Sequence, residues 1–165
     1  MSKKNQQFFD TIYRQCYPMV LQMCLGFMKG DTDIANDLSQ EVFINIWKAI
    51  DKFKGKSSSK TWVYRITVNT CLQYIRKEKK KSNIPLEKIE GILADEHSGS
   101  KTEQDQSLYR AIGKLEKIDR LIIMMVLEGQ DYDNISNVLG IQPTNVRVKI
   151  HRIKKRLKKI LDNEQ

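Results

Sequence analysis

The spacing of apolar residues favours helices along most of the chain, and no segment shows the regular alternation typical of a β-strand. After Asp31 and Asp33, either of which can cap a helix, apolar residues recur at every fourth position: Ile34, Leu38, Val42, Ile46 and Ile50. The 8 glycines and 3 prolines among 165 residues are sparse enough to mark helix ends. The sequence therefore predicts an all-α protein.

A second amphipathic helix is expected to begin after serines 57–59 and to continue to about Lys80. At 100° per residue, one arc of about 80° gathers a mostly polar and basic set: Trp62, Arg65, Asn69, Gln73, Arg76 and Lys80. The opposite side gathers Val63, Ile66, Thr70, Cys71 and Tyr74. Trp62 beside the stretch FKGKSSSK suits stacking on unpaired nucleic-acid bases, worth ~1 to 3 kcal/mol per base. Packing of Trp62 on a neighbouring helix is an equally supported interpretation.

The second half of the chain has the spacing of a helix-turn-helix. Leu108, Ile112 and Leu115 indicate one helix, the apolar run 121–127 a buried second helix ending near Gly129, and residues 132–139 a short third. Gly140 then ends that helix, and Pro143 or Thr144 begins a long last one.

The last helix has a narrow apolar stripe: Val146, Ile150, Ile153, Leu157 and Ile160. The opposite side presents Thr144, Val148, His151 and Lys155, flanked by Arg147 and Arg152. A recognition helix reads base edges with its N-terminal turns and holds phosphates with flanking cations. A solvent-exposed basic helix is the alternative, but the glycine turn, the stripe and the cations together favour DNA binding.

The segment between the two halves reads SNIPLEKIEGILADEHSGSKT, with Pro85, Gly91 and Gly99 and no sustained period. It indicates a flexible linker at 82–103 that joins two small helical domains, at 5–81 and 104–162.

The net charge of +9 is divided unevenly along the chain. Residues 51–80 contain 9 basic against 2 acidic side chains, and residues 141–165 contain 8 against 2, whereas residues 81–140 are net acidic. Two separate basic blocks favour two surfaces for a long polyanion, because clustered Lys and Arg release counterions from phosphates. Solvated helix faces are the alternative.

Three acids, Asp33, Asp37 and Glu41, lie at i, i+4 and i+8, and no Lys or Arg lies between Asp31 and Trp47. Like charges at this spacing cost stability, so the acidic row suggests a basic protein partner. A solvated face that complements the helix dipole explains it equally well. Metal binding is disfavoured, because one straight helix cannot bring stacked carboxylates to one point.

Other classes have little support in the sequence. The longest apolar run, residues 121–127, is seven residues, well short of the ~18 of a membrane span, and the start MSKKNQQ lacks the apolar stretch of a signal peptide. A cytoplasmic protein is expected. Cysteines 16, 24 and 71 lack CxxC spacing and are expected to be buried thiols, and His97 and His151 lie far apart, so we expect neither a metal nor a cofactor.

Three motifs resemble the extracytoplasmic-function class of bacterial RNA polymerase sigma factors: DLSQEVFINIW at 37–47, FKGKSSSKTWVYRITVN at 53–69, and DYDNISNVLGIQPTNVRVKIHRIKKRL at 131–157. They occur in the order and with the intervening linker of that family. The resemblance implies transcription initiation without enzymatic activity, since the polymerase performs the chemistry. A stand-alone helix-turn-helix regulator is the main alternative, and it does not account for the first two motifs. A metal-dependent nucleic-acid enzyme would need converging ligands that the sequence lacks.

The resemblance also implies partners and contact residues. The first domain would bind the clamp helices of the largest subunit of core RNA polymerase through Asp37, Gln40, Glu41, Asn45 and Trp47. It would capture the melted minus-10 strand with Lys56, Ser57, Ser58, Lys60, Trp62, Arg65, Asn69 and Arg76. The second domain would hold the polymerase flap and read the minus-35 duplex with Thr144, Asn145, Arg147, Val148, His151, Arg152 and Lys155. An anti-sigma factor, membrane-bound or soluble, is a candidate further partner.

The chain departs from the family pattern at Ser59, Gln73, Glu116 and Val148. The family often has an aromatic or aliphatic residue, an acid, a proline, and Ser or Thr, respectively, at these places. A valine can contact a thymine methyl but cannot donate a hydrogen bond, so Val148 predicts a changed base preference in the minus-35 element.

Overall fold

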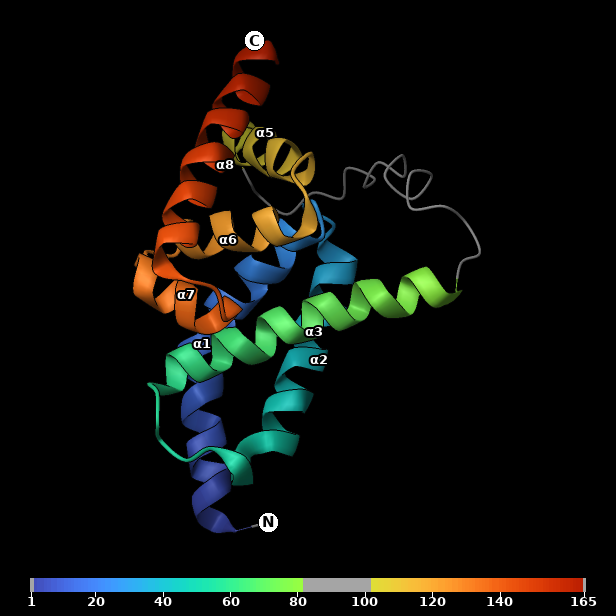
Figure 1. The fold of residues 1–165 in the computed structure, drawn as a ribbon. Coiled ribbons are helices and arrows are strands. Elements are labelled where there is room, and N and C mark those ends of the chain that lie inside the picture. The colour runs from blue at the N-terminus through green and yellow to red at the C-terminus, as the bar shows by residue number, and fades with distance from the viewer. Residues whose placement is uncertain (1, 82–101, 165) are drawn as a thin grey trace.

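The computed structural model describes residues 2–81 and 102–164, and within them every regular element is helical (Figure 1). The first unit contains α1 (Lys3–Phe27), α2 (Thr32–Ala49), the 3-10 turn η1 (Ile50–Lys52) and α3 (Ser59–Lys81). The second contains α5 (Glu103–Gly113), α6 (Lys117–Leu127), α7 (Tyr132–Leu139) and α8 (Pro143–Asn163). The all-α class is confirmed. Of the expected linker, residues 82–101 lie outside the described residues, while Thr102 caps α5 and Glu103 already belongs to it.

The helix α1 is the longest element. It precedes the first helix that the apolar spacing predicts. Ser2 caps it by accepting a hydrogen bond from the Asn5 backbone N–H, 3.2 Å away. Its buried side includes Ile12, Val20, Met23 and Phe27, each at most 1% exposed. This side contacts α2 and α3 and also α5 and α6, so α1 is the element around which both units pack.

The helices α2 and α3 follow the predicted periods. Asp31 caps α2 by accepting from the Ile34 N–H at 3.1 Å, and Leu38, Val42 and Ile46 are buried against the neighbouring helices. On α3 the predicted apolar side is buried at Val63, Thr70 and Cys71 and half-buried at Ile66 and Tyr74. The three cysteines are buried thiols, as expected.

The helix-turn-helix has the predicted bounds. Gly140 follows α7 with a φ of +70°, in the left-handed region that glycine adopts without steric cost, and its N–H bonds to the Ser136 carbonyl. Pro143 then begins α8, where its missing N–H costs nothing. The stripe Val146, Ile150, Ile153 and Leu157 is buried, and Ile160 is half-buried. The opposite side of α8 is therefore left to solvent.

The two units share one continuous apolar core. Besides the contacts of α1 with α5 and α6, α3 packs against α7 (Figure 1). The Tyr109 hydroxyl of α5 donates to the Gln22 side-chain oxygen of α1. The guanidinium of Arg120, on α6, lies 5.3 Å from the centre of the Phe27 ring and donates to the Leu115 carbonyl at 2.8 Å. In this structure the domains thus pack together.

None of the helices in the described ranges is both long and apolar enough to cross a membrane.

Because Phe27 belongs to this shared core, Phe27→Ala should destabilise both units together. The expected loss is about 3 to 5 kcal/mol of unfolding free energy, the usual effect of removing a buried aromatic ring. Urea unfolding followed by tryptophan fluorescence, which reports on the first unit, and by far-UV circular dichroism, which reports on both, would measure it. Coincident transitions are expected in the parent protein. Transitions that separate in the parent would contradict a shared core.

Candidate functional site

The face of α2 turned away from the core combines acids with apolar side chains. Asp33, Asp37 and Gln40 are exposed, and Ile44 further along is 52% exposed. Trp47, at the end of the same face, is half-buried and meets the Phe9 ring of α1 edge-on at 4.9 Å. The exposed strip therefore begins acidic and ends apolar, a composition suited to a protein partner rather than to nucleic acid.

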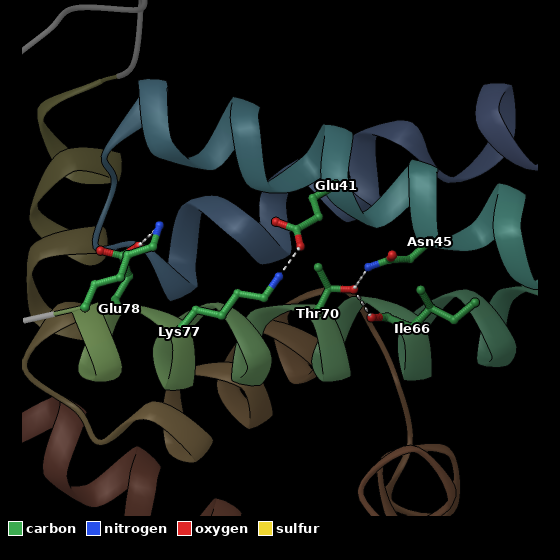
Figure 2. A network of polar contacts seen from close by, with 7 residues as sticks. Glu41, Asn45, Ile66, Thr70, Lys77 and Glu78 are labelled. Atoms are coloured by element: carbon green, nitrogen blue, oxygen red, sulfur yellow. Dashed lines mark hydrogen bonds and ion pairs between the residues drawn. The ribbon is translucent and has the colours of Figure 1, made fainter.

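Glu41 differs from the expectation that the acidic row has no basic neighbour. Its Oε1 lies 3.3 Å from Nζ of Lys77, on α3 (Figure 2). This partner is 36 residues away in sequence, which is why local spacing did not reveal it. Both side chains are more than a third exposed, so the pair contributes little to stability. Asp33 and Asp37 remain the most accessible acids of the row.

Asn45, which the motif suggested as a polymerase contact, is hydrogen-bonded within the first unit, whereas its neighbour Ile44 is exposed. The Asn45 side-chain amide donates to Thr70 Oγ1 at 3.1 Å, and that hydroxyl donates to the Ile66 carbonyl at 2.7 Å (Figure 2). Asn45 therefore ties α2 to α3. Ile44, which sequence reasoning missed, occupies the exposed place between Gln40 and Trp47. Its signal is an isoleucine on the polar side of the α2 period, four residues after Gln40.

Aromatic rings extend the apolar end of this strip onto α1. Tyr13 is 44% exposed, and its ring centre lies 4.7 Å from that of Phe43. The Tyr17 ring contacts both of these rings, with its centre 5.3 Å from that of Tyr13 and 6.0 Å from that of Phe43. The Phe9 ring contacts those of Tyr13 and Trp47, so the three rings form a packed, partly exposed surface next to Ile44.

The loop before α3 and the start of that helix hold the first basic surface. Lys56 and Lys60 are exposed, and Ser57 is half-buried. Ser58 caps the helix, because its Oγ accepts from the Thr61 N–H at 3.1 Å. This bond fixes the direction in which α3 leaves the loop.

Trp62 packs within the first unit and stays half-exposed. Its ring centre lies 4.8 Å from that of Phe53, and Phe53 stacks on Phe8 at 5.4 Å. The packing interpretation is therefore realised in this structure. Part of the indole stays accessible to solvent.

Further along α3, the basic face is only partly open. Asn69, Gln73 and Arg76 are exposed. Arg65 is half-buried, and its Nε donates to the Asn137 carbonyl of α7 at 3.3 Å. The second unit thus contacts this face near the start of α3, at Arg65, and leaves the rest of the face accessible.

The helix α8 presents its predicted residues together on one open face: Thr144, Asn145, Arg147, Val148, His151, Arg152 and Lys155 are all exposed. Val148 is 47% exposed and is the apolar member of this set. The Arg147 guanidinium lies 5.5 Å from the centre of the Tyr132 ring of α7, an attractive arrangement that restrains Arg147.

A hollow of about 340 Å³ lies between the first turns of α7 and α8, lined by Asp131, Tyr132, Asp133, Pro143, Thr144 and Arg147. Asp131 accepts from the Asn134 N–H at 2.8 Å and so caps α7. Within the described ranges no cluster of three or more His, Cys, Asp or Glu is placed to hold a metal ion.

Comparison with protein families accounts for both units. Residues 12–81 match the family described as Sigma-70 region 2, and residues 105–157 match Sigma-70, region 4. The chain belongs to the extracytoplasmic-function class of bacterial RNA polymerase sigma factors. The sigma factor is 30% identical over 165 residues to the extracytoplasmic-function sigma factor SigW of Bacillus subtilis, covering 92% of this chain and 83% of that protein. It is 26% identical over 162 residues to sigma factor YlaC of the same species, covering 94% and 93%.

Solved structures share the fold of this sigma factor. Sigma factor RpoE of Bartonella quintana, determined in complex with the anti-sigma factor NepR, gives a TM-score of 0.78 at 19% identity, covering 96% of this chain and 99% of that one. CnrH in complex with the cytosolic domain of CnrY gives 0.71 at 20% identity, covering 97% and 91%.

The contact between Trp62 and Phe53 predicts that Trp62 has a structural role in the sigma factor. Trp62→Ala should reduce the unfolding free energy by ~2 kcal/mol, less than for a fully buried ring. Trp62→Phe keeps a ring against Phe53 and should cost less than half as much. Urea unfolding of both variants, followed by far-UV circular dichroism, measures the difference. Equal stability of Trp62→Ala and the parent would show that the ring contact contributes nothing.

Proposed function

We propose that this sigma factor binds core RNA polymerase and directs it to promoters by capturing the melted minus-10 strand and reading the minus-35 duplex. The observation that supports the proposal most strongly is α8. Its apolar stripe is buried by the second unit, while the seven predicted minus-35 residues are exposed together on its other side. A helix held in this way can enter a major groove without disturbing the core behind it.

The polymerase surface is proposed to be the exposed strip of α2. Asp37 and Gln40 supply polar contacts, and Ile44, with the adjoining Trp47 and Tyr13 rings, supplies apolar area that would be desolvated on binding. Glu41 would exchange its weak pair with Lys77 for a contact to the clamp. Asn45 would act through α3, by holding the two helices in register.

Capture of the melted strand is proposed for the loop and the basic face of α3. Lys56, Lys60, Arg65 and Arg76 would hold phosphates, and the open side of Trp62 would stack on an unpaired base. The Phe53 ring behind Trp62 fixes the indole plane before the strand arrives. A fixed plane reduces the entropy lost on stacking.

In the minus-35 complex, Thr144, Val148 and His151 would lie at the centre of the groove, with Arg147, Arg152 and Lys155 towards the phosphates. Tyr132 restrains Arg147 at the rim of this face. A change of the central residues would alter which bases are preferred. A change of the flanking cations would alter affinity for all sequences.

An anti-sigma factor is proposed as a further partner, because both structural neighbours named above were determined with one. The proposed place of action is the cytoplasm, where the polymerase works. The deciding experiment is run-off transcription with core polymerase and genomic fragments, followed by mapping of the start sites. Discrete start sites that require the sigma factor would support the function. Promoter binding without polymerase, and no transcription with it, would favour a stand-alone regulator.

The α2 strip predicts a defect in polymerase binding that does not involve unfolding. Asp37→Lys combined with Ile44→Ala should weaken association with core polymerase at least ~10-fold, since a reversed charge at an interface costs several kcal/mol. Both side chains are exposed, so helicity should not change. Asp10→Lys, the same charge reversal at an exposed position of α1, is the matched control. Unchanged affinity of a folded double variant would remove this strip from the interface.

The arrangement of α8 predicts that specificity and affinity separate by residue. Val148→Ser should change the preferred minus-35 bases by ~1 to 3 kcal/mol at one base pair, with little general loss. Arg152→Ala should weaken all promoters nearly equally and reduce the salt slope by about 1. Selection from a randomised minus-35 library by holoenzyme containing each variant measures both. New base preferences for Arg152→Ala but not for Val148→Ser would mean that α8 is rotated differently in the groove.

A further inference from the structure

We propose that the first turns of α1 take part in strand capture, with Phe8 as a positioning residue that holds the loop 53–58 and the Trp62 ring in the geometry that receives the melted strand. The inference rests on the proposed function, because it concerns the surface assigned there to the minus-10 strand. It goes beyond it by adding residues of α1 to that surface. Phe8 precedes residue 12, where the match to Sigma-70 region 2 begins.

Three aromatic rings anchor the start of the loop. The centre of the Phe53 ring lies 5.4 Å from that of Phe8, on α1, and the two planes are 22° apart. The same Phe53 ring lies 4.8 Å from that of Trp62, on α3. All three side chains are half-buried, so these contacts form near the surface. Phe8 therefore supports the ring that supports Trp62.

A polar contact joins the same two segments about one turn nearer the start of α1. The Asn5 side-chain amide donates to the carboxylate of Asp51, on η1, which lies beside the first turns of α1 (Figure 1). The Phe53 N–H then bonds to the Ile50 carbonyl at 3.3 Å, at the end of η1. The start of the loop is thus held against α1 by a hydrogen bond and by a ring contact.

The other end of the loop is fixed by the helix that follows it. The Ser58 Oγ accepts from the Thr61 N–H at 3.1 Å and donates to the Thr61 hydroxyl at 2.9 Å. Between the two ends, Gly55 turns the chain with a φ of +70°, and a Cβ added there would meet no atom within 4 Å. The exposed Lys54 and Lys56 therefore extend from a loop whose two ends are held.

Anchoring of this kind favours binding of a flexible strand. A loop that is already held in the free protein loses less conformational entropy when it binds. Trp62 gains the same advantage, because Phe53 sets its plane and Phe8 supports Phe53. Phe8 needs no contact with DNA for this effect, so its role is to position the residues that do contact the strand.

The next ring along α1 provides a matched control. Phe9 is also half-buried, but its ring lies 4.9 Å from that of Trp47 and 6.2 Å from that of Tyr13, beside the α2 strip. Adjacent residues of a helix point about 100° apart, so the two rings support different surfaces. Phe9→Ala removes the same ring as Phe8→Ala and should leave the loop 53–58 unchanged.

The first measurement follows the loop in the free, full-length chain. Trypsin can cleave after Lys54 and Lys56, and mass spectrometry gives the rate of each cut at short digestion times. Phe8→Ala should be cut at both sites several-fold faster than the parent, because proteolysis follows the population of the released loop. Phe8→Tyr, which keeps a ring against Phe53, should be cut at the parent rate, as should Phe9→Ala.

A second variant weakens the anchor without removing a ring. Asn5→Ala deletes the hydrogen bond to Asp51 and leaves the aromatic contacts in place, so the helicity measured by far-UV circular dichroism should not change. It should also speed cleavage after the two loop lysines, by less than Phe8→Ala does. Gln6→Ala, at the next and exposed position of α1, is the matched control. This variant tests the anchor even if Phe8→Ala does not fold.

The second measurement uses holoenzyme assembled with excess sigma factor. The probes are labelled single-stranded oligonucleotides that span the minus-10 element of a promoter mapped by run-off transcription, with each base replaced in turn by an abasic site. The base that stacks on Trp62 is the one whose removal costs affinity in the parent but not in Trp62→Ala. Comparison of protein and DNA changes in this way isolates the one contact.

Phe8→Ala should weaken binding of the intact strand about 2- to 10-fold, the range for ordering one side chain on binding. It should also reduce the abasic penalty at the base identified through Trp62, and Phe8→Tyr should restore both values. A merely structural role would lower the affinity for all oligonucleotides alike and leave that penalty in place.

Four outcomes would overturn the proposal: cleavage of the Phe8→Ala and Asn5→Ala loops at the parent rate, equal acceleration by Phe9→Ala, an unchanged affinity for the intact strand, or an unchanged abasic penalty. The trypsin result needs neither DNA nor polymerase, so it is independent of the proposed function. If the loop is released as expected but holoenzyme with the parent chain initiates at no promoter, the proposed function fails, and the role in strand capture fails with it, while the anchor on α1 stands.

Discussion

Burial of the apolar side of α1 is the interaction on which the other arrangements depend. This helix contacts α2 and α3 with one part of its surface and α5 and α6 with another. A domain of 50 to 80 residues buries a limited fraction of its surface, so a shared helix lets each unit remove more apolar area from water than it could alone. The shared core also determines which surfaces of the sigma factor can face solvent.

The exposed surfaces differ in chemistry because the elements that present them differ in what they bury. The helix α8 buries only a narrow stripe, so its remaining circumference is available for long cations around Thr144 and Val148. The helix α2 is covered by α1 on one side and α3 on another, which leaves a strip of acids that ends at Ile44 and Trp47. In the proposed function, a polyanion and a protein partner are assigned to these separate surfaces, which would let the sigma factor bind both at once.

The candidate site shows where local pattern was sufficient. The α8 face follows from a helical period that runs for 21 residues with a clear apolar stripe, and every predicted residue on it is exposed. The α2 and α3 surfaces were less predictable. The Asn45 amide donates a hydrogen bond to Thr70, and Glu41 forms an ion pair with Lys77. Arg65 donates a hydrogen bond to Asn137, 72 residues away. Each of these contacts joins helices whose relative placement no local period describes.

The sequence by itself determined the helical class, the turn at Gly140, the start of α8 at Pro143 and the burial of its stripe, because these depend on backbone preference and on a repeat of 3.6 residues. Only the tertiary structure decided whether Trp62 packs or stays free, which side chain of α2 is exposed beside Gln40, and whether the two domains touch. Those outcomes depend on packing between surfaces distant in sequence. The approach of Met124 to Gly26 is an example. A glycine near the end of α1 gives no periodic signal in the sequence, yet the absence of a side chain there leaves the space that Met124 of the second domain fills.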